Sequence, residues 1–218
     1  MTTLIDAARR GASKTLKKLI DSKADLDAAD DSGYTALMLA ALNGYAVSLQ
    51  LLLEAKANIH ARDNTGATAL AMAAYGGHVK CMQLLIDADA DVHVRNDENS
   101  TVLMVAASRG NLDCLRLLLD LDIDIEAVNI KGYTAVLASA GNGHSDCLQM
   151  LIDAQANVDA ANPSSSSPLV MAAVRNHVDC VRRLIAAKAY LNAEEDCMTA
   201  LLQTAFAGRA DCLQLLVD

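Results

Sequence analysis

The chain has 218 residues and a formal net charge of −9, and 53% of its residues are hydrophobic. Aromatic residues are scarce, with one Phe, five Tyr and no Trp, so Ala, Leu and Ile must build the core, which favours closely packed helices over a β-sandwich. The acidic balance argues against nucleic acid or an anionic membrane as the default partner and favours a protein partner with a neutral or basic segment.

Along the chain, one turn-and-Thr motif recurs in DSGYTAL at residue 31, NTGATAL at 64 and KGYTAVL at 131. The Thr of this motif keeps a 33-residue step, at Thr35, Thr68, Thr101 and Thr134. The predicted units are 1–30, which is cap-like, then 31–63, 64–96, 97–129, 130–162 and 163–194, followed by the incomplete 195–218. Such a period is typical of a single repeat domain that spans residues 1–218.

Each unit contains the same elements in the same order, as residues 64–96 illustrate. A polar turn precedes Thr68, whose hydroxyl is expected to cap the short helix ALAMAAY. The helix is expected to break near Gly77, and a longer second helix runs through CMQLLIDA. The segment DADVHVRND then leads into the next turn as an extended arm.

This arrangement resembles the ankyrin repeat over essentially the whole chain. The family's turn Gly and Thr-Pro-Leu-His motif survives as G-x-T-A-L at 33–37 and 66–70, and its Ala-Ala-x-x-Gly motif survives at 7–11 and 40–44. Its Leu-Leu and Ala-Asp-Val segments survive at 84–85 and 90–92. The resemblance implies an all-α solenoid of stacked helix-turn-helix units joined by β-hairpin-like loops.

The sequence departs from the family's pattern in four ways. The family's His after Leu is replaced by Met38, Ala71, Met104, Leu137, Val170 and Leu202. The Gly expected after each second helix is replaced by Lys23, Lys56, Asp89, Asp122, Gln155 and Lys188, which predicts strained left-handed loops. Asn99 at a turn-Gly position is a milder replacement. The last step is one residue short, so we expect an irregular backbone around residues 194–199.

Five cysteines share the first inward position of the second helix: Cys81, Cys114, Cys147, Cys180 and Cys212. His78, His144 and His177 precede three of them by three residues, which raises metal binding, redox chemistry and packing as alternatives. Stacked helices lie about 8–10 Å apart, too far for a disulfide, and one unit supplies at most two metal ligands. We therefore predict that these five cysteines, called the Cys ladder below, are buried side chains that pack in the core. Cys197 lies off the ladder and is expected in a turn, as an exposed thiol without an activating base.

Other polar features have structural interpretations. His60 and His93 share an arm position and are expected to support the hairpin turn. The NPSSSSP segment at 162–168 is interpreted as a turn, with a phosphorylated switch as the alternative. The chain contains no phosphate-binding loop, nucleophile elbow or zinc-protease motif. We therefore predict a protein that is not an enzyme and has no cofactor or metal.

The resemblance implies a partner site on the concave face, formed by the hairpin tips and the exposed side of the first helices. The positions that differ between repeats predict ten partner-binding residues: Tyr34, Asn43, Tyr75, Glu98, Ser108, Arg109, Lys131, Tyr133, Asn142 and Arg175. The tips carry many acids, whereas Arg10, Arg109 and Arg175 recur near the ends of first helices. This predicts a basic partner segment at the tips and an acidic or backbone-rich one at the arginines.

Three functions remain open on the sequence alone. The first is a monomeric, non-catalytic scaffold that binds protein, the second a targeting or regulatory arm of a larger enzyme, kinase or channel, and the third a small-ligand or redox sensor. The N-terminal unit is lysine-rich, which is typical of a polar cap. The last unit ends in LQLLVD without polar substitutions, which predicts that further repeats follow or that another chain packs there. The chain lacks a secretory signal, a bilayer-length apolar run and a disulfide framework, which predicts a cytoplasmic or nuclear location.

Overall fold

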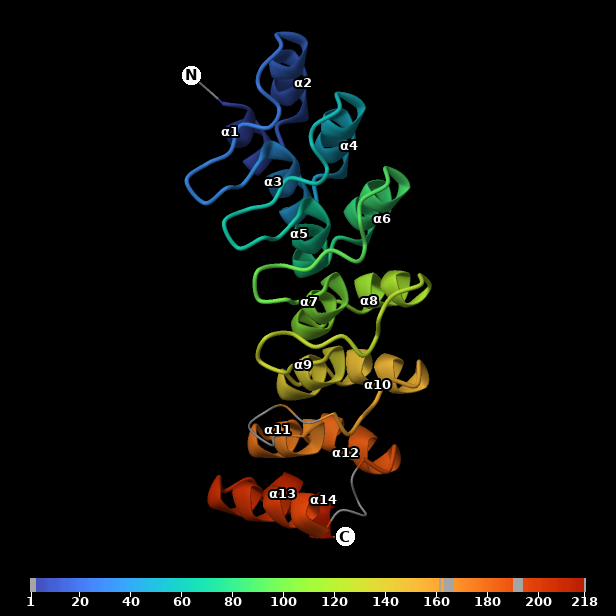
Figure 1. Cartoon of the computed structure of the whole chain (residues 1–218). Coiled ribbons are helices and arrows are strands. Elements are labelled where there is room, and N and C mark those ends of the chain that lie inside the picture. The colour runs from blue at the N-terminus through green and yellow to red at the C-terminus, as the bar shows by residue number, and fades with distance from the viewer. Residues whose placement is uncertain (1–2, 161, 163–166, 190–193, 218) are drawn as a thin grey trace.

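The computed structural model describes residues 3–160, 162, 167–189 and 194–217, with the backbone alone described from 194 to 199. Over these residues the chain forms fourteen α-helices and no strand, arranged as seven consecutive pairs (Figure 1). The helices are α1 (Leu4–Arg9), α2 (Ser13–Asp21), α3 (Ala36–Leu42), α4 (Ala46–Glu54), α5 (Ala69–Gly76), α6 (Val79–Asp87), α7 (Val102–Arg109), α8 (Leu112–Leu119), α9 (Ala135–Gly141), α10 (Ser145–Asp153), α11 (Pro168–Val174), α12 (Val178–Ala186), α13 (Glu194–Phe206) and α14 (Ala210–Val217).

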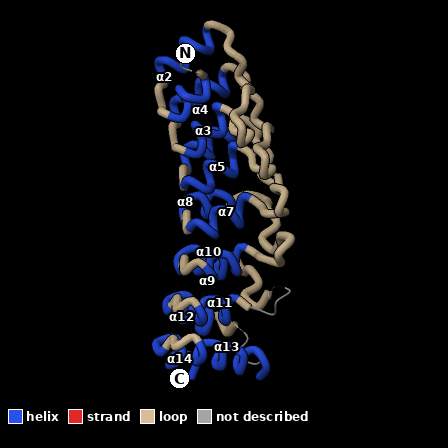
Figure 2. The backbone as a smooth tube through the Cα atoms, turned by 90° about the vertical axis from the view of Figure 1, so that its left-hand side faces the viewer, coloured by secondary structure: helices blue, strands red, loops and turns tan. Residues whose placement is uncertain are grey.

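The helices stack in two layers. The first helices of successive pairs pack on one another from α1 through α13, and the second helices pack in the same order from α2 through α14. The loops that join the pairs project to one side of the stack and form a column of hairpins beside the first helices (Figures 1 and 2). This is the repeat solenoid that the periodicity predicts.

Most of the first helices begin where the sequence predicts, because a hydroxyl caps the start. The side chains of Thr35, Thr101 and Thr134 accept the N–H of the residue three positions later, at 3.3, 3.3 and 3.2 Å. Ser167 caps α11 in the same way, with Pro168 at the first helical position. Thr68 is the exception, since its Oγ1 is buried and has no hydrogen-bond partner.

The core is built from small and aliphatic side chains. Paired alanines such as Ala73–Ala74 and Ala106–Ala107 are completely buried between neighbouring first helices. Leucines of the second helices, among them Leu85 and Leu118, are equally inaccessible. The small Ala side chains let helix backbones approach closely, which explains why a chain with so few aromatics still forms a continuous core.

The hairpins are held by side-chain hydrogen bonds in addition to backbone bonds across the turn, such as Asp63 N–H to Ala67 O at 2.9 Å. Asp30, Asp63 and Asn129 each accept two backbone N–H groups of their own turn, at 2.8–3.0 Å. Neighbouring tips are joined by backbone bonds, such as Asn64 N–H to Ser32 O at 3.1 Å and Asp97 N–H to Thr65 O at 3.0 Å. The tips therefore form a connected rim along the solenoid.

The structure confirms most of the predicted left-handed loops. Lys23, Lys56, Asp89, Gln155 and Lys188 have φ between 58° and 68°, and Asn99 has φ of 60°. The prediction is wrong for Asp122, which lies outside the left-handed region. Helix α8 ends at Leu119 and is one residue shorter than the second helices on either side, so the loop after it follows a different path.

The end of the chain departs from the regular repeat, as the 32-residue step predicts. Helix α13 has 13 residues and begins at Glu194, before the position of the usual capping Thr. The prediction that Cys197 lies in a turn is wrong, because the residue belongs to this lengthened helix. Pro163 and the serines at 164–166 lie outside the described residues.

Candidate partner-binding groove

A cleft of about 690 Å³ runs along the face between the hairpin tips and the first helices. Its walls come from five consecutive pairs, from Tyr34 and Leu42 at one end to Arg175 at the other. The floor is largely apolar and includes Met72, Val105 and other side chains of the first helices. Polar side chains of the hairpins edge it. Such a surface suits an elongated ligand.

Small residues give the groove its depth. Tyr34 and Tyr133 occupy the same repeat position, and the two positions between them hold Ala67 and Ser100. The two tyrosines therefore stand three repeats apart, with a lower stretch between them. Ala71 widens this stretch on the helix side, because it replaces the larger Met or Leu of the neighbouring repeats.

The tyrosines are held in place by the same contacts that build the hairpins and helices. The backbone N–H of Tyr34 donates to Asp30 Oδ1 and that of Tyr133 donates to Asn129 Oδ1, both at 3.0 Å. Tyr75, at the end of α5, leaves 47% of its surface exposed. The guanidinium of Arg109 lies 4.2 Å from the centre of its ring, a cation–π contact.

The structure brings seven of the ten predicted partner-binding residues together on the groove walls. These are Tyr34, Tyr75, Glu98, Ser108, Tyr133, Asn142 and Arg175. Their role in binding stays a prediction. Arg109 lies beside the groove through its contact with Tyr75.

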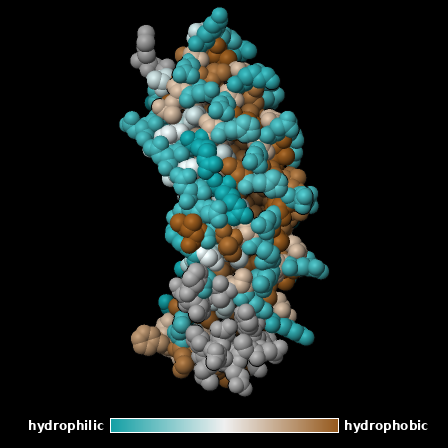
Figure 3. All heavy atoms as spheres, viewed as in Figure 1, coloured by the Kyte–Doolittle hydropathy of each residue, from teal (hydrophilic) through white to brown (hydrophobic). Residues whose placement is uncertain are grey.

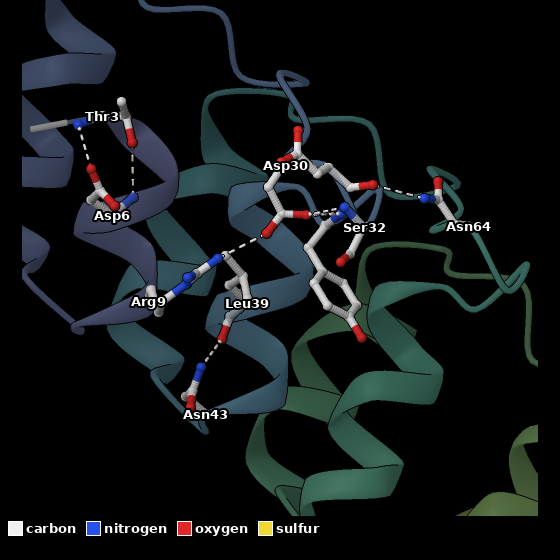
Figure 4. A network of polar contacts seen from close by, with 10 residues as sticks. Thr3, Asp6, Arg9, Asp30, Ser32, Leu39, Asn43 and Asn64 are labelled. Carbon is white, nitrogen blue, oxygen red and sulfur yellow. Dashed lines mark hydrogen bonds and ion pairs between the residues drawn. The ribbon is translucent and has the colours of Figure 1, made fainter.

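Two of the ten residues, Asn43 and Lys131, lie outside the cleft and contact other groups of the chain. Asn43 donates from Nδ2 to the carbonyl of Leu39 at 2.8 Å and so closes its own helix (Figure 4). The Lys131 ammonium lies 2.7 Å from the carboxylate of Glu98 on the preceding tip. Neither lines the cleft, although Glu98 does.

Several acids along the hairpins form ion pairs with cations of the same chain. Asp30 is 2.8 Å from Arg9 (Figure 4), Asp97 is 3.7 Å from Arg62, and Asp124 is 3.4 Å from Arg95. Hydrophilic side chains dominate the hairpin side in the upper part of Figure 3. These ion pairs are exposed and contribute little to stability, but they reduce the charge that the tips present to a partner.

One hairpin carries an apolar tip that the predicted set omits. Val128 and Ile130 are 49% and 67% exposed. The positions equivalent to Ile130 hold Asp31, Asn64 and Asp97 in the earlier repeats. This break in a polar repeat position is the signal that the sequence offers for it.

The Cys ladder is part of the core. Cys81, Cys114, Cys147, Cys180 and Cys212 are at most 1% exposed, which confirms the packing interpretation. Burial raises the pKa of Cys114, Cys147 and Cys180 to about 11, with the neighbouring carboxylates of Asp113, Asp146 and Asp179 adding to the shift. Thiols of this kind are poor nucleophiles at neutral pH.

The histidines ahead of the ladder join neighbouring repeats. The Nε2–H groups of His144 and His177 donate to the carbonyls of Ser108 and Gly141, at 3.0 and 3.1 Å. Their rings also cover the glycine that ends the preceding first helix, since a Cβ at Gly110 would lie 2.5 Å from Nδ1 of His144. No group of three potential ligands occurs among the residues with described side chains.

The arm position of His60 and His93 has a structural role in two other repeats. The carboxylates of Asp27 and Glu126 accept the N–H of Asn58 and Asn157 in the next arm, at 2.8 and 2.7 Å. Both histidines are exposed. That they support the hairpin in the same way stays a prediction.

Comparison with known proteins decides the family. Sequence models of ankyrin repeats match residues 4–96, 88–162 and 169–217. The chain belongs to the ankyrin-repeat family. The crystal structure of the human ASB11 ankyrin repeat domain has 24% sequence identity and a TM-score of 0.89, covering 100% of this chain and 97% of that one. This likeness shows the fold alone. No curated protein sequence matches the chain.

Ankyrin repeats are generally protein–protein interaction modules and are typically non-catalytic. None of the described helices combines the length and the apolar character needed to cross a membrane. The groove is therefore considered below as a surface for a protein partner.

Proposed function

We propose that this ankyrin-repeat chain is a non-catalytic scaffold that binds a protein partner through its groove and hairpin tips. The groove itself carries this proposal, because it joins an apolar floor to fixed tyrosines across five repeats. Tyr and Arg are typical anchors of protein interfaces, and Tyr75 and Arg109 form such a pair beside the cleft. The proposal places the protein in the cytoplasm or nucleus as a monomer.

The partner segment that faces the tips is proposed to be basic. The net charge of −9 favours a basic partner over long distances, and Asp31 on the first described tip is exposed without an ion pair among the described residues. The paired acids of the later tips contribute less, because Arg62, Arg95 and Lys131 already compensate them.

A groove-filling variant tests the proposal without changing charge. Ser108 lies on the groove wall, half-buried, so Ser108→Trp should block the central stretch. Gln83→Trp adds the same bulk to the exposed surface of the second helix α6 and serves as the control. Both variants must retain the helical circular dichroism of the wild type.

The measurement is affinity capture from cell extract with quantitative mass spectrometry. We expect wild type and Gln83→Trp to retain a common partner, and we expect Ser108→Trp to recover at least about tenfold less of it, because the added ring blocks the centre of the interface. Equal recovery by all three proteins would reject the groove as the binding surface.

A further inference from the structure

The two sides of the groove differ in how their charges are satisfied. On the hairpin side, each of Arg62, Arg95 and Lys131 has a carboxylate partner within 4 Å. On the helix side, Arg109 and Arg175 have no carboxylate partner among the described residues. The uncompensated positive charge beside the cleft is therefore concentrated at these two arginines.

Both arginines are held in position by contacts that leave donors available. The centre of the Arg109 guanidinium lies 4.2 Å from the centroid of the Tyr75 ring, and this cation–π contact engages none of its N–H groups in a hydrogen bond. Arg175 donates one N–H, from Nη1, to the carbonyl of Gly141 at 2.6 Å. A guanidinium has five N–H donors, so a fork for a carboxylate remains on each.

The repeat geometry fixes the distance between the two positions. Arg109 ends α7 and Arg175 follows α11, with α9 packed between them. Each side chain contacts the preceding repeat, Arg109 at Tyr75 and Arg175 at Gly141. The two guanidinium groups are therefore also two repeats apart. Helices packed about 8–10 Å apart place the two guanidinium groups about 16–20 Å from each other.

We propose that the groove takes an extended peptide segment of the partner that carries two acidic side chains, one for Arg109 and one for Arg175. An extended chain advances about 3.3 Å per residue, which sets the acidic residues about five or six positions apart. Apolar side chains between them face Val105 and Ala138 on the floor. This inference rests on the proposed function and adds the chemistry and spacing of the bound segment.

The chain offers a control with the same charge and spacing. Arg116 on α8 and Arg182 on α12 are exposed, two repeats apart and without an ion pair among the described residues. They belong to the second-helix layer, away from the groove. The variants Arg109→Ala/Arg175→Ala and Arg116→Ala/Arg182→Ala therefore change the net charge equally and differ only in the surface they alter.

The probe is a phage library of random 16-residue peptides, selected in parallel on wild type, the two arginine variants and Ser108→Trp. We expect wild type and Arg116→Ala/Arg182→Ala to enrich peptides with two Asp or Glu residues five or six positions apart. The same peptides should not be enriched on Arg109→Ala/Arg175→Ala. By fluorescence anisotropy, a selected peptide should bind that variant at least about tenfold more weakly and lose affinity with added salt.

Two outcomes would overturn the inference. Peptides that lack the acidic pair but are lost on Ser108→Trp would show a groove with different chemistry, and the proposed function would stand. The inference would also be rejected if the selected peptides bound both groove variants as well as wild type, or if no peptide were enriched. The capture experiment with Ser108→Trp would then decide the proposed function separately.

Discussion

Interior repeats and the last repeat place the same side chains in different surroundings. Leu137 in α9 is completely buried, whereas Leu202, at the same repeat position in α13, is 64% exposed. Leu118 in α8 is also inaccessible, and its equivalent Leu216 in α14 is only half-buried. The difference shows that burial in this solenoid is supplied by the neighbouring repeat, as expected when each repeat contacts only the units beside it.

The largest expected effect concerns the Cys ladder. A pKa raised to about 11 by burial lowers the thiolate fraction of Cys114 at pH 8 by about 100-fold, so N-ethylmaleimide should modify it at least that much more slowly than in the denatured chain. The rate should increase as the pH approaches 11. Cys212 should react faster, because its repeat is covered on one side only.

Peptide mapping by mass spectrometry after timed labelling measures each thiol. Equal rates for Cys114 and Cys212 in the native protein would contradict the difference between interior and terminal repeats.

The next effect compares two leucines at one repeat position. Leu118→Ala should cost about 2–5 kcal/mol of unfolding free energy, because it leaves a cavity between packed helices. Leu216→Ala should cost about 1 kcal/mol, because its side chain is only partly buried. Urea denaturation followed by circular dichroism measures both. A larger loss for Leu216→Ala would show that an unseen contact covers the last repeat.

Two left-handed glycines separate backbone strain from crowding. Gly110 has φ of 72° and a Cβ would lie 2.5 Å from the His144 ring, so Gly110→Ala should cost about 2–4 kcal/mol. Gly208 has φ of 68° and nothing within 4 Å of a Cβ, so Gly208→Ala should cost only about 1–2 kcal/mol. Equal losses of unfolding free energy, measured by urea denaturation, would mean that the His144 ring moves aside without an energetic penalty.

The smallest effect concerns the loops after the second helices. Lys56 has φ of 68°, so Lys56→Gly should stabilise the protein by about 0.5–1 kcal/mol through relief of strain. Asp122 occupies the same repeat position, but its backbone lies outside the left-handed region. Asp122→Gly should therefore destabilise the protein by a similar amount, because glycine makes the unfolded chain more flexible. Thermal denaturation compares the two, and a shift of the same sign in both would contradict the assignment.

The periodic features of the fold could be predicted from the sequence because every repeat provides an independent copy of the signal. The capping residues Thr35 and Ser167, the buried Cys ladder and the left-handed Lys56 all recur at fixed positions. Asp122 could not be predicted, because α8 ends one residue early without a local Gly or Pro that would mark the end.

The groove could be predicted only in part. Variation between repeats identified Tyr34, Tyr75 and Tyr133, but it did not separate residues that line the cleft from Lys131, which pairs with an acid of the neighbouring tip. The small residues that form the depth, such as Ala67, give no sequence signal, because their contribution is the space they leave. The placement of Cys197 failed because the longer helix α13 replaces the expected turn.

Photo-crosslinking in cells tests most directly which face binds. A benzoyl-phenylalanine replaces Tyr75 on the groove in one protein and Val47, which is 65% exposed on α4, in another. We predict a crosslinked partner from position 75 and none of comparable yield from position 47. Stronger crosslinking from position 47 would contradict the groove as the binding surface and place it on the second helices.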